Sequence, residues 1–183
     1  MRGARGFTMI ELMIVALIVV ILTLIALPNF SDWLQNSRTR SVAESLQNGM
    51  RFAQSESARL SRLTKIVTTG SSWNVRVVQV AGSLSAIDTQ ASDILQSSPA
   101  GNLDFVAISP NSPNNTVLEF NDLGRVSSSS TLTGTFNALS TDAVFTVSNS
   151  HGPRSLQIKV SPSGKVRMCD PDRTLSATDP NGC

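Results

Sequence analysis

The sequence predicts an α+β fold, with one long N-terminal α-helix packed on an antiparallel β body. Two observations predict the helix. An apolar run covers residues 12–27, with Thr23 as its one polar residue, and after Pro28 apolar or small residues recur every three or four positions. A third observation predicts the sheet, because β-branched and alternating runs separated by turn residues fill the remainder. A helix followed by strands is the order of an α+β protein.

The composition excludes several classes of protein. The chain has 183 residues, of which 40% are hydrophobic, so it is not disordered, and only 15% are charged. A net charge of +2 gives no strong overall field toward nucleic acid or an acidic partner. Two cysteines and one histidine are too few for a zinc site of four protein ligands. We therefore expect no metal and no cofactor.

The first element is an apolar helix that carries one acid. Extended back to Phe7, the run has 21 residues, about 31 Å of helix, which suffices for a hydrocarbon core of about 30 Å. Glu11 lies inside it, where a lone charge costs roughly 2.5–3.5 kcal/mol at mid-bilayer and needs a partner. Arg2 and Arg5 precede the run, so the positive-inside rule places the body outside the cytoplasm.

Residues 5–28 read RGFTMIELMIVALIVVILTLIALP. They resemble the class III leader of type IV pilins and pseudopilins. The resemblance implies that a prepilin peptidase cuts between Gly6 and Phe7 and methylates the new amino terminus at Phe7. It also implies that Glu11 pairs with the terminal amine of a neighbouring subunit, since opposite charges in low dielectric offset each other's desolvation. An ordinary N-terminal anchor is the alternative.

The helix is predicted to continue as an amphipathic segment over residues 29–61. One stripe of it is expected to lie against the sheet, and its members are Val42, Leu46, Met50, Ala53, Ser57 and Leu60. Gly49 costs about 1 kcal/mol in a helix interior and is expected to allow close approach to the sheet. Another face is basic, and a solvated face is favoured over a phosphate-contacting one. The resulting division is a leader over 1–6, a transmembrane and assembly helix over 7–28, the amphipathic segment, and a periplasmic β domain over 62–183.

Eight strands are predicted after the helix. Their ranges are 62–69, 73–80, 103–109, 116–120, 125–128, 143–148, 155–160 and 165–169, with turn residues such as Gly70-Ser71-Ser72 and Ser161-Pro162-Ser163-Gly164 between them. Polar, low-complexity sequence predicts longer loops over 81–102 and 127–135.

The C-terminal part narrows the resemblance to the GspH/FimT branch of minor pilins and pseudopilins. Members of that branch commonly carry a late Gly-Arg-x-Arg-x-Cys motif, which here reads GKVRMC over 164–169, with lysine in place of the first arginine. In the FimT type, such a patch is associated with binding DNA for uptake. Lys165 and Arg167 project from one face of a strand, and Arg154 and Arg173 are expected to join them, opposed by Asp170 and Asp172.

Binding of this kind would be contact with the phosphates of double-stranded DNA, independent of sequence and weakened by salt. The alternatives are a solvated strand face and a salt-bridge face to a neighbouring subunit.

Cys169 and Cys183 are the two cysteines. Both lie after the predicted membrane span, on the side that faces an oxidising compartment. A bond between them would close a loop of about 15 residues and stabilise the fold by near 3 kcal/mol. Two free thiols are the alternative.

The leading functional prediction is a minor pilin that takes part in type IV pilus assembly, in filament initiation at or near the tip. It would be a single-pass protein of the bacterial inner membrane with its body in the periplasm. Its expected partners are the prepilin peptidase and other major and minor pilins or pseudopilins. A DNA receptor for transformation and a pseudopilin of a type II secretion machine are the rival hypotheses. No enzyme is predicted, because His151 beside Gly152-Pro153 is typical of a turn and no catalytic triad or nucleotide-binding motif occurs in the sequence.

Overall fold

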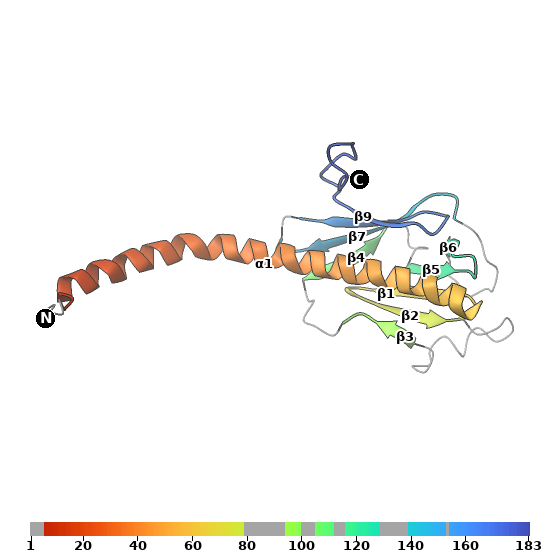
Figure 1. The fold of residues 1–183 in the computed structure, drawn as a ribbon, viewed down its shortest axis with the longest axis horizontal. Coiled ribbons are helices and arrows are strands. Elements are labelled where there is room, and N and C mark those ends of the chain that lie inside the picture. The colour runs from red at the N-terminus through yellow and green to blue at the C-terminus, as the bar shows by residue number, and fades with distance from the viewer. Residues whose placement is uncertain (1–5, 79–93, 100–104, 112–115, 129–138, 153) are drawn as a thin grey trace, which may run out of the picture.

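A computed structural model describes residues 6–78, 94–99, 105–111, 116–128, 139–152 and 154–183, and for 25–29 it describes the backbone without the side chains. One helix, α1 (Met9–Leu60), runs through more than a quarter of the chain. Its N-terminal half extends away from the body, and its C-terminal half lies across the β-strands (Figure 1). The predicted α+β fold, a long helix on antiparallel sheets, is confirmed.

The strands form two sheets. The first sheet has the order β3-β2-β1-β5-β6, and the second has the order β4-β7-β8-β9. In the first, β1 spans Thr64–Thr69, β2 Ser72–Val77, β3 Ile94–Ser97, β5 Val117–Phe120 and β6 Val126–Ser128. In the second, β4 spans Val106–Pro110, β7 Ala143–Asn149, β8 Leu156–Val160 and β9 Val166–Cys169. Every strand pair in both sheets is antiparallel.

The helix packs against both sheets through its predicted stripe. Leu46, Met50 and Ala53 are fully buried in the core, while Leu60 at the end of the stripe is half-buried. They meet inward-facing residues of the sheets such as Phe120 and Phe145, which are also fully buried. The hydrophobic core therefore lies between α1 and the two sheets.

Gly49 is a point of close approach between α1 and β2. A Cβ atom placed on Gly49 would lie 2.6 Å from two ring carbons of Trp73. The Trp73 indole N–H donates a hydrogen bond to Ser45 Oγ at 3.2 Å, which fixes the ring across the helix. The close approach that the sequence predicted for Gly49 is thus made with Trp73.

The structure departs from the prediction in one of the expected loops. Residues 94–97 lie within the predicted loop 81–102, yet they form the edge strand β3. Leu95, Gln96 and Ser97 are all exposed, so this strand has no buried face and shows no alternation in the sequence. Its pairing with β2 rests on backbone hydrogen bonds, which any residue can supply. The other predicted loop lies outside the described residues from position 129 onward.

Candidate functional site

The amino end of α1 holds the predicted cleavage and assembly residues. Gly6 and Phe7 precede the helix and are not helical, and Thr8 is the N-cap. The Glu11 amide donates to Thr8 Oγ1 at 3.3 Å, and the Thr8 amide donates to Glu11 Oε2 at 3.4 Å. This reciprocal pair is a capping box, which satisfies two backbone donors at the helix start. The Glu11 carboxylate remains exposed to solvent or to another molecule.

The apolar side chains of the N-terminal half of α1 are exposed. Between Phe7 and Leu24 the large hydrophobic side chains are 49–84% exposed, so nothing in the described chain covers them. Figure 1 shows this half standing clear of the β body. Within the part of the chain that the structure describes, no helix combines the length and apolarity that crossing a membrane requires. Residues 25–27, the end of the predicted apolar run, are among those without described side chains.

The C-terminal segment folds back on the end of β9. The predicted disulfide between Cys169 and Cys183 is present. The Asp170 amide donates to the Asn181 carbonyl at 2.7 Å, and the Cys183 amide donates to the Arg173 carbonyl at 2.9 Å. The bond and these contacts hold together a polar segment that has no helix or strand of its own.

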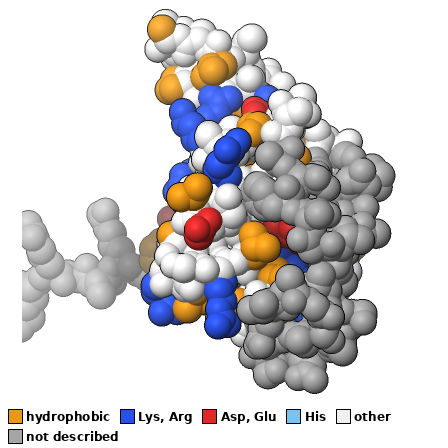
Figure 2. Space-filling model, turned by 90° about the vertical axis from the view of Figure 1, so that its right-hand side faces the viewer, with side chains coloured by type: hydrophobic (Ala, Val, Ile, Leu, Met, Phe, Trp, Pro, Cys, Tyr) orange, Lys and Arg blue, Asp and Glu red, His pale blue; other side chains and the backbone are white. Residues whose placement is uncertain are grey.

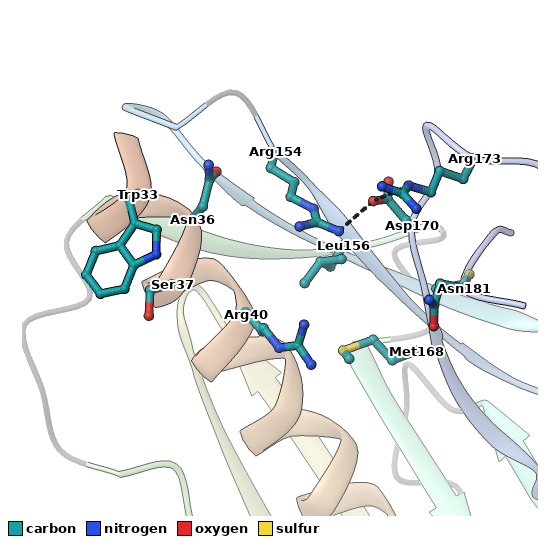
Figure 3. Close-up of a pocket in the computed structure, with 11 residues that line it drawn as sticks. Trp33, Asn36, Ser37, Arg40, Arg154, Leu156, Met168, Asp170, Arg173 and Asn181 are labelled. Atoms are coloured by element: carbon teal, nitrogen blue, oxygen red, sulfur yellow. Dashed lines mark hydrogen bonds and ion pairs between the residues drawn. The ribbon is translucent and has the colours of Figure 1, made fainter. Parts of the chain in front are cut away.

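Arg154 and Arg173 meet at a buried carboxylate. Arg154 Nη2 donates to Asp170 Oδ2 at 2.8 Å (Figure 3), and Arg173 lies 3.7 Å from the same oxygen. The Asp170 side chain is only 7% exposed, whereas both arginines are about half exposed. The two guanidinium groups thus offset the desolvation of a buried charge.

Lys165 and Arg167 lie on the other face of the same sheet. Met168 and Leu156 face α1, where they line a pocket with Trp33. Because side chains alternate along a strand, Arg167 points to the opposite face, and so does Lys165 two residues earlier. The structure therefore brings Lys165 and Arg167 together, and separates them from Arg154 and Arg173.

A third cation on this outer face was missed by the sequence analysis. Lys159 of β8 is the direct cross-strand partner of Arg167. The sequence contains the information needed to find Lys159. The turn at Ser161–Gly164 joins two predicted strands, and its length sets the register that places Lys159 opposite Arg167. We define the outer basic row as Lys159, Lys165 and Arg167.

On the face that Figure 2 shows, the described basic residues do not form one continuous surface. Figure 2 views the body from the end away from the amino terminus, and its Lys and Arg side chains form separate groups with neutral and acidic side chains between them.

Among the described residues, no group of three or more His, Cys, Asp or Glu could hold a metal ion.

Comparison with models of protein families identifies the family to which this chain belongs. A family described as "Type II transport protein GspH" matches residues 42–164, which is about two thirds of the chain. The chain belongs to the GspH family. The "Prokaryotic N-terminal methylation motif" matches residues 1–27 of this GspH-family protein. It is therefore a minor pilin or pseudopilin.

Individual relatives match different shares of this GspH-family protein. The type IV major alpha-pilin and the fimbrial protein Q of Moraxella bovis are each 47% identical to it over 49 residues, 27% of this chain. The chain spans about a third of the length of these relatives, at 31%. The crystal structure of the Pseudomonas aeruginosa type IV minor pilin FimU matches with a TM-score of 0.52 and 16% identity. That match covers 74% of this chain and 91% of FimU, and it shows the shared fold.

Proposed function

We propose that this GspH-family protein is a minor pilin of a type IV pilus, held in the bacterial inner membrane by residues 7–28 with its β body in the periplasm. The observation that supports this most strongly is the exposed apolar half of α1. Apolar surface of this extent is stable against lipid or against other helices, and a subunit that moves from membrane to fibre meets both. The proposed role is structural and involves no catalysis.

The leader supports processing between Gly6 and Phe7 by a prepilin peptidase, with methylation of Phe7. Residues 6–8 are not helical, so the peptide bond to be cut lies in backbone that a peptidase can bind in extended form. Gly6→Ala should leave the full-length chain, whereas the control Gly3→Ala should mature normally. The measurement is intact mass, and loss of residues 1–6 from the Gly6→Ala chain would contradict the assignment.

Glu11 is proposed to set the register between subunits. Its bonds to Thr8 are long, at 3.3 and 3.4 Å, and exposed, so its carboxylate can accept a stronger partner. The methylated amine of a neighbouring subunit would be that partner. An ion pair among packed apolar helices is worth more than one in water, because each charge offsets the other's desolvation.

Incorporation into the fibre tests this role. Glu11→Ala should lower the amount of the protein in sheared pili by more than about tenfold. Without the carboxylate, the positively charged amine of the neighbouring subunit would be left unpaired among apolar helices. Glu44→Ala is the matched control, because Glu44 is an acid on α1 whose ion pair with Arg40 is exposed. Equal incorporation of the Glu11→Ala and Glu44→Ala proteins would overturn the proposal.

The alternative is a pseudopilin of a type II secretion machine, and the match to the family described as a type II transport protein favours it. Deletion of the gene in its host separates the two. Loss of surface pili with unchanged protein export supports the pilus, and the reverse result supports secretion.

A second function, non-specific binding of double-stranded DNA, is favoured by the outer basic row. Three cations on neighbouring strands, with Lys159 opposite Arg167, can contact successive phosphates. In gel shifts with the full chain in detergent, changing all three to Gln should reduce the salt slope of log K by about 3. Arg38→Gln plus Arg62→Gln is a control on exposed arginines of α1 and of the turn that follows it. An unchanged slope in the triple variant removes this function.

A further inference from the structure

Two turns of the body share one architecture. They are residues 121–125, between β5 and β6, and residues 161–165, between β8 and β9. In each turn the first residue's amide donates to the carbonyl of the fifth at 3.0 Å, and the first residue's side chain accepts the fifth residue's amide. The fourth residue is a glycine with a φ of 71° or 87°, a conformation that favours glycine. The fifth residue, which follows it directly, is basic, and it is Arg125 in one turn and Lys165 in the other.

The two turns are bonded to each other at the junction of the two sheets. The Val126 amide donates to the Pro162 carbonyl at 3.2 Å. Gly164 lies directly against Gly124, because a Cβ atom on Gly164 would collide with the Gly124 carbonyl oxygen. Gln54 of α1 donates to the same oxygen at 3.1 Å. The basic residue after each glycine is therefore held near its counterpart, on backbone that is already ordered before a ligand binds.

Arg125 and Lys165 are both available to a ligand. Each is exposed. Among the described residues no carboxylate pairs with either of them, whereas Arg154 is held by Asp170 at 2.8 Å. Lys165 already belongs to the outer basic row of the second sheet, so Arg125 continues that row onto the first sheet. Cations that follow one another along an open surface suit a linear polyanion, because each can contact a different phosphate.

We propose that Arg125 is a further contact for double-stranded DNA, and that the bound DNA runs from the outer basic row across the paired turns. This inference rests on the proposed DNA binding by that row. The planar fork of Arg125 matches two oxygens of one phosphate, which a lysine ammonium does not. Such a contact positions the DNA backbone and does not read its sequence. It places the DNA at the end of the body away from the amino terminus, where Figure 1 shows β5 and β6.

Gel shifts with the full chain in detergent, at a series of salt concentrations, test this contact. Arg125→Gln should reduce the salt slope of log K by about 0.9, the value for one phosphate contact. The hydrogen bonds of the turn use the backbone of Arg125, so this variant keeps them. Arg125→Lys keeps the charge and should retain the slope. Arg38→Gln, on an exposed arginine of α1, is the matched control and should leave the slope unchanged.

Photocrosslinking locates the DNA independently of affinity. The photocrosslinker p-benzoylphenylalanine in place of Leu123, which is 78% exposed in the turn before Arg125, should crosslink to DNA. The same group in place of Leu175, which is 51% exposed on the C-terminal segment, should not.

Each outcome decides the proposal. An unchanged slope in Arg125→Gln, together with a reduced slope in the triple variant of the outer basic row, refutes the Arg125 contact alone. An unchanged slope in the triple variant refutes the proposed DNA binding and this inference with it. A slope lowered equally by Arg38→Gln would show an effect of net charge and overturn the contact. Loss of the slope in Arg125→Lys, or equal crosslinking from positions 123 and 175, would also overturn it.

Discussion

At the scale of single residues, packing and helix propensity make opposite demands at Gly49. Alanine is favoured over glycine by about 1 kcal/mol in a helix interior. Yet the added Cβ would lie 2.6 Å from the Trp73 ring, and Trp73 is only 3% exposed, so the ring has little room to move. Glycine is therefore retained for the contact between α1 and β2 rather than for flexibility.

Gly49→Ala should lower the free energy of unfolding by about 1 kcal/mol, because overpacking costs about 1–3 kcal/mol and exceeds the gain in propensity. Asn48→Ala is the control. Asn48 is exposed and adjacent, so this change should raise stability by about 0.5 kcal/mol. Urea unfolding of both full-length variants in detergent measures the difference. A stabilised Gly49→Ala protein would show that Trp73 shifts at no cost.

Glu119 introduces a dependence of stability on pH. Burial raises the pKa of this carboxyl above its ordinary value of 4.5, while the hydrogen bond from Ser127 and the charge of Lys65 lower it to a smaller extent. A raised pKa in the folded state means that the folded protein holds the proton more tightly than the unfolded chain. This contribution to stability is complete below the unfolded pKa and is lost as pH rises through the folded one.

The contribution of Glu119 to wild-type stability should therefore fall as pH rises from about 4.5 through its raised pKa. Glu119→Gln removes the titrating group, so the difference in Tm between variant and wild type should change across that interval and be constant above it. Thermal unfolding at a series of pH values measures this difference. Parallel curves would show that Glu119 does not titrate differently in the folded protein.

At the scale of elements, the helices and strands that can be predicted from the sequence are those that bury one face. The helix stripe and strands such as β7 and β8 alternate cleanly between buried and half-buried positions, because one side meets the core. The edge strand β3 has no such pattern and was not predicted. The division into two sheets was not predicted either, because strand partners depend on contacts far apart in sequence. Lys65 illustrates this, since it is buried at 2% exposure opposite Glu119 of β5.

The C-terminal segment depends on its disulfide more than on packing. Residues 171–179 are mostly exposed, so they bury little apolar surface. Cys169→Ala plus Cys183→Ala should lower the free energy of unfolding by about 3 kcal/mol, the value for a loop closed over a separation of 14 residues. Denaturation of the wild type with reductant should reproduce this loss, and reductant should not affect the double variant. A loss below about 1 kcal/mol would mean that the backbone bonds of Asp170 suffice.

At the scale of the whole molecule, the layered fold assigns different roles to arginines and lysines that are close in sequence. The motif indicated Lys165, Arg167, Arg154 and Arg173 as one patch. Strand alternation places the first two on the outer face and the other two beside α1 around Asp170. Sequence spacing could assign the face of Lys165 and Arg167, but it could not show that a buried carboxylate holds the remaining pair.

This separation predicts effects of different size on stability for two single substitutions. Arg154→Gln should lower the free energy of unfolding by about 1–2 kcal/mol, because Asp170 is 7% exposed and keeps Arg173, at 3.7 Å, and the Asp172 amide, at 3.1 Å, as weaker partners. The loss is smaller than for a fully buried pair, since Arg154 itself is about half exposed. Lys165→Gln should change stability by less than about 0.5 kcal/mol, because Lys165 is exposed. Urea unfolding compares the two, and equal stabilities would place Arg154 with the surface cations of the outer basic row rather than with the buried carboxylate.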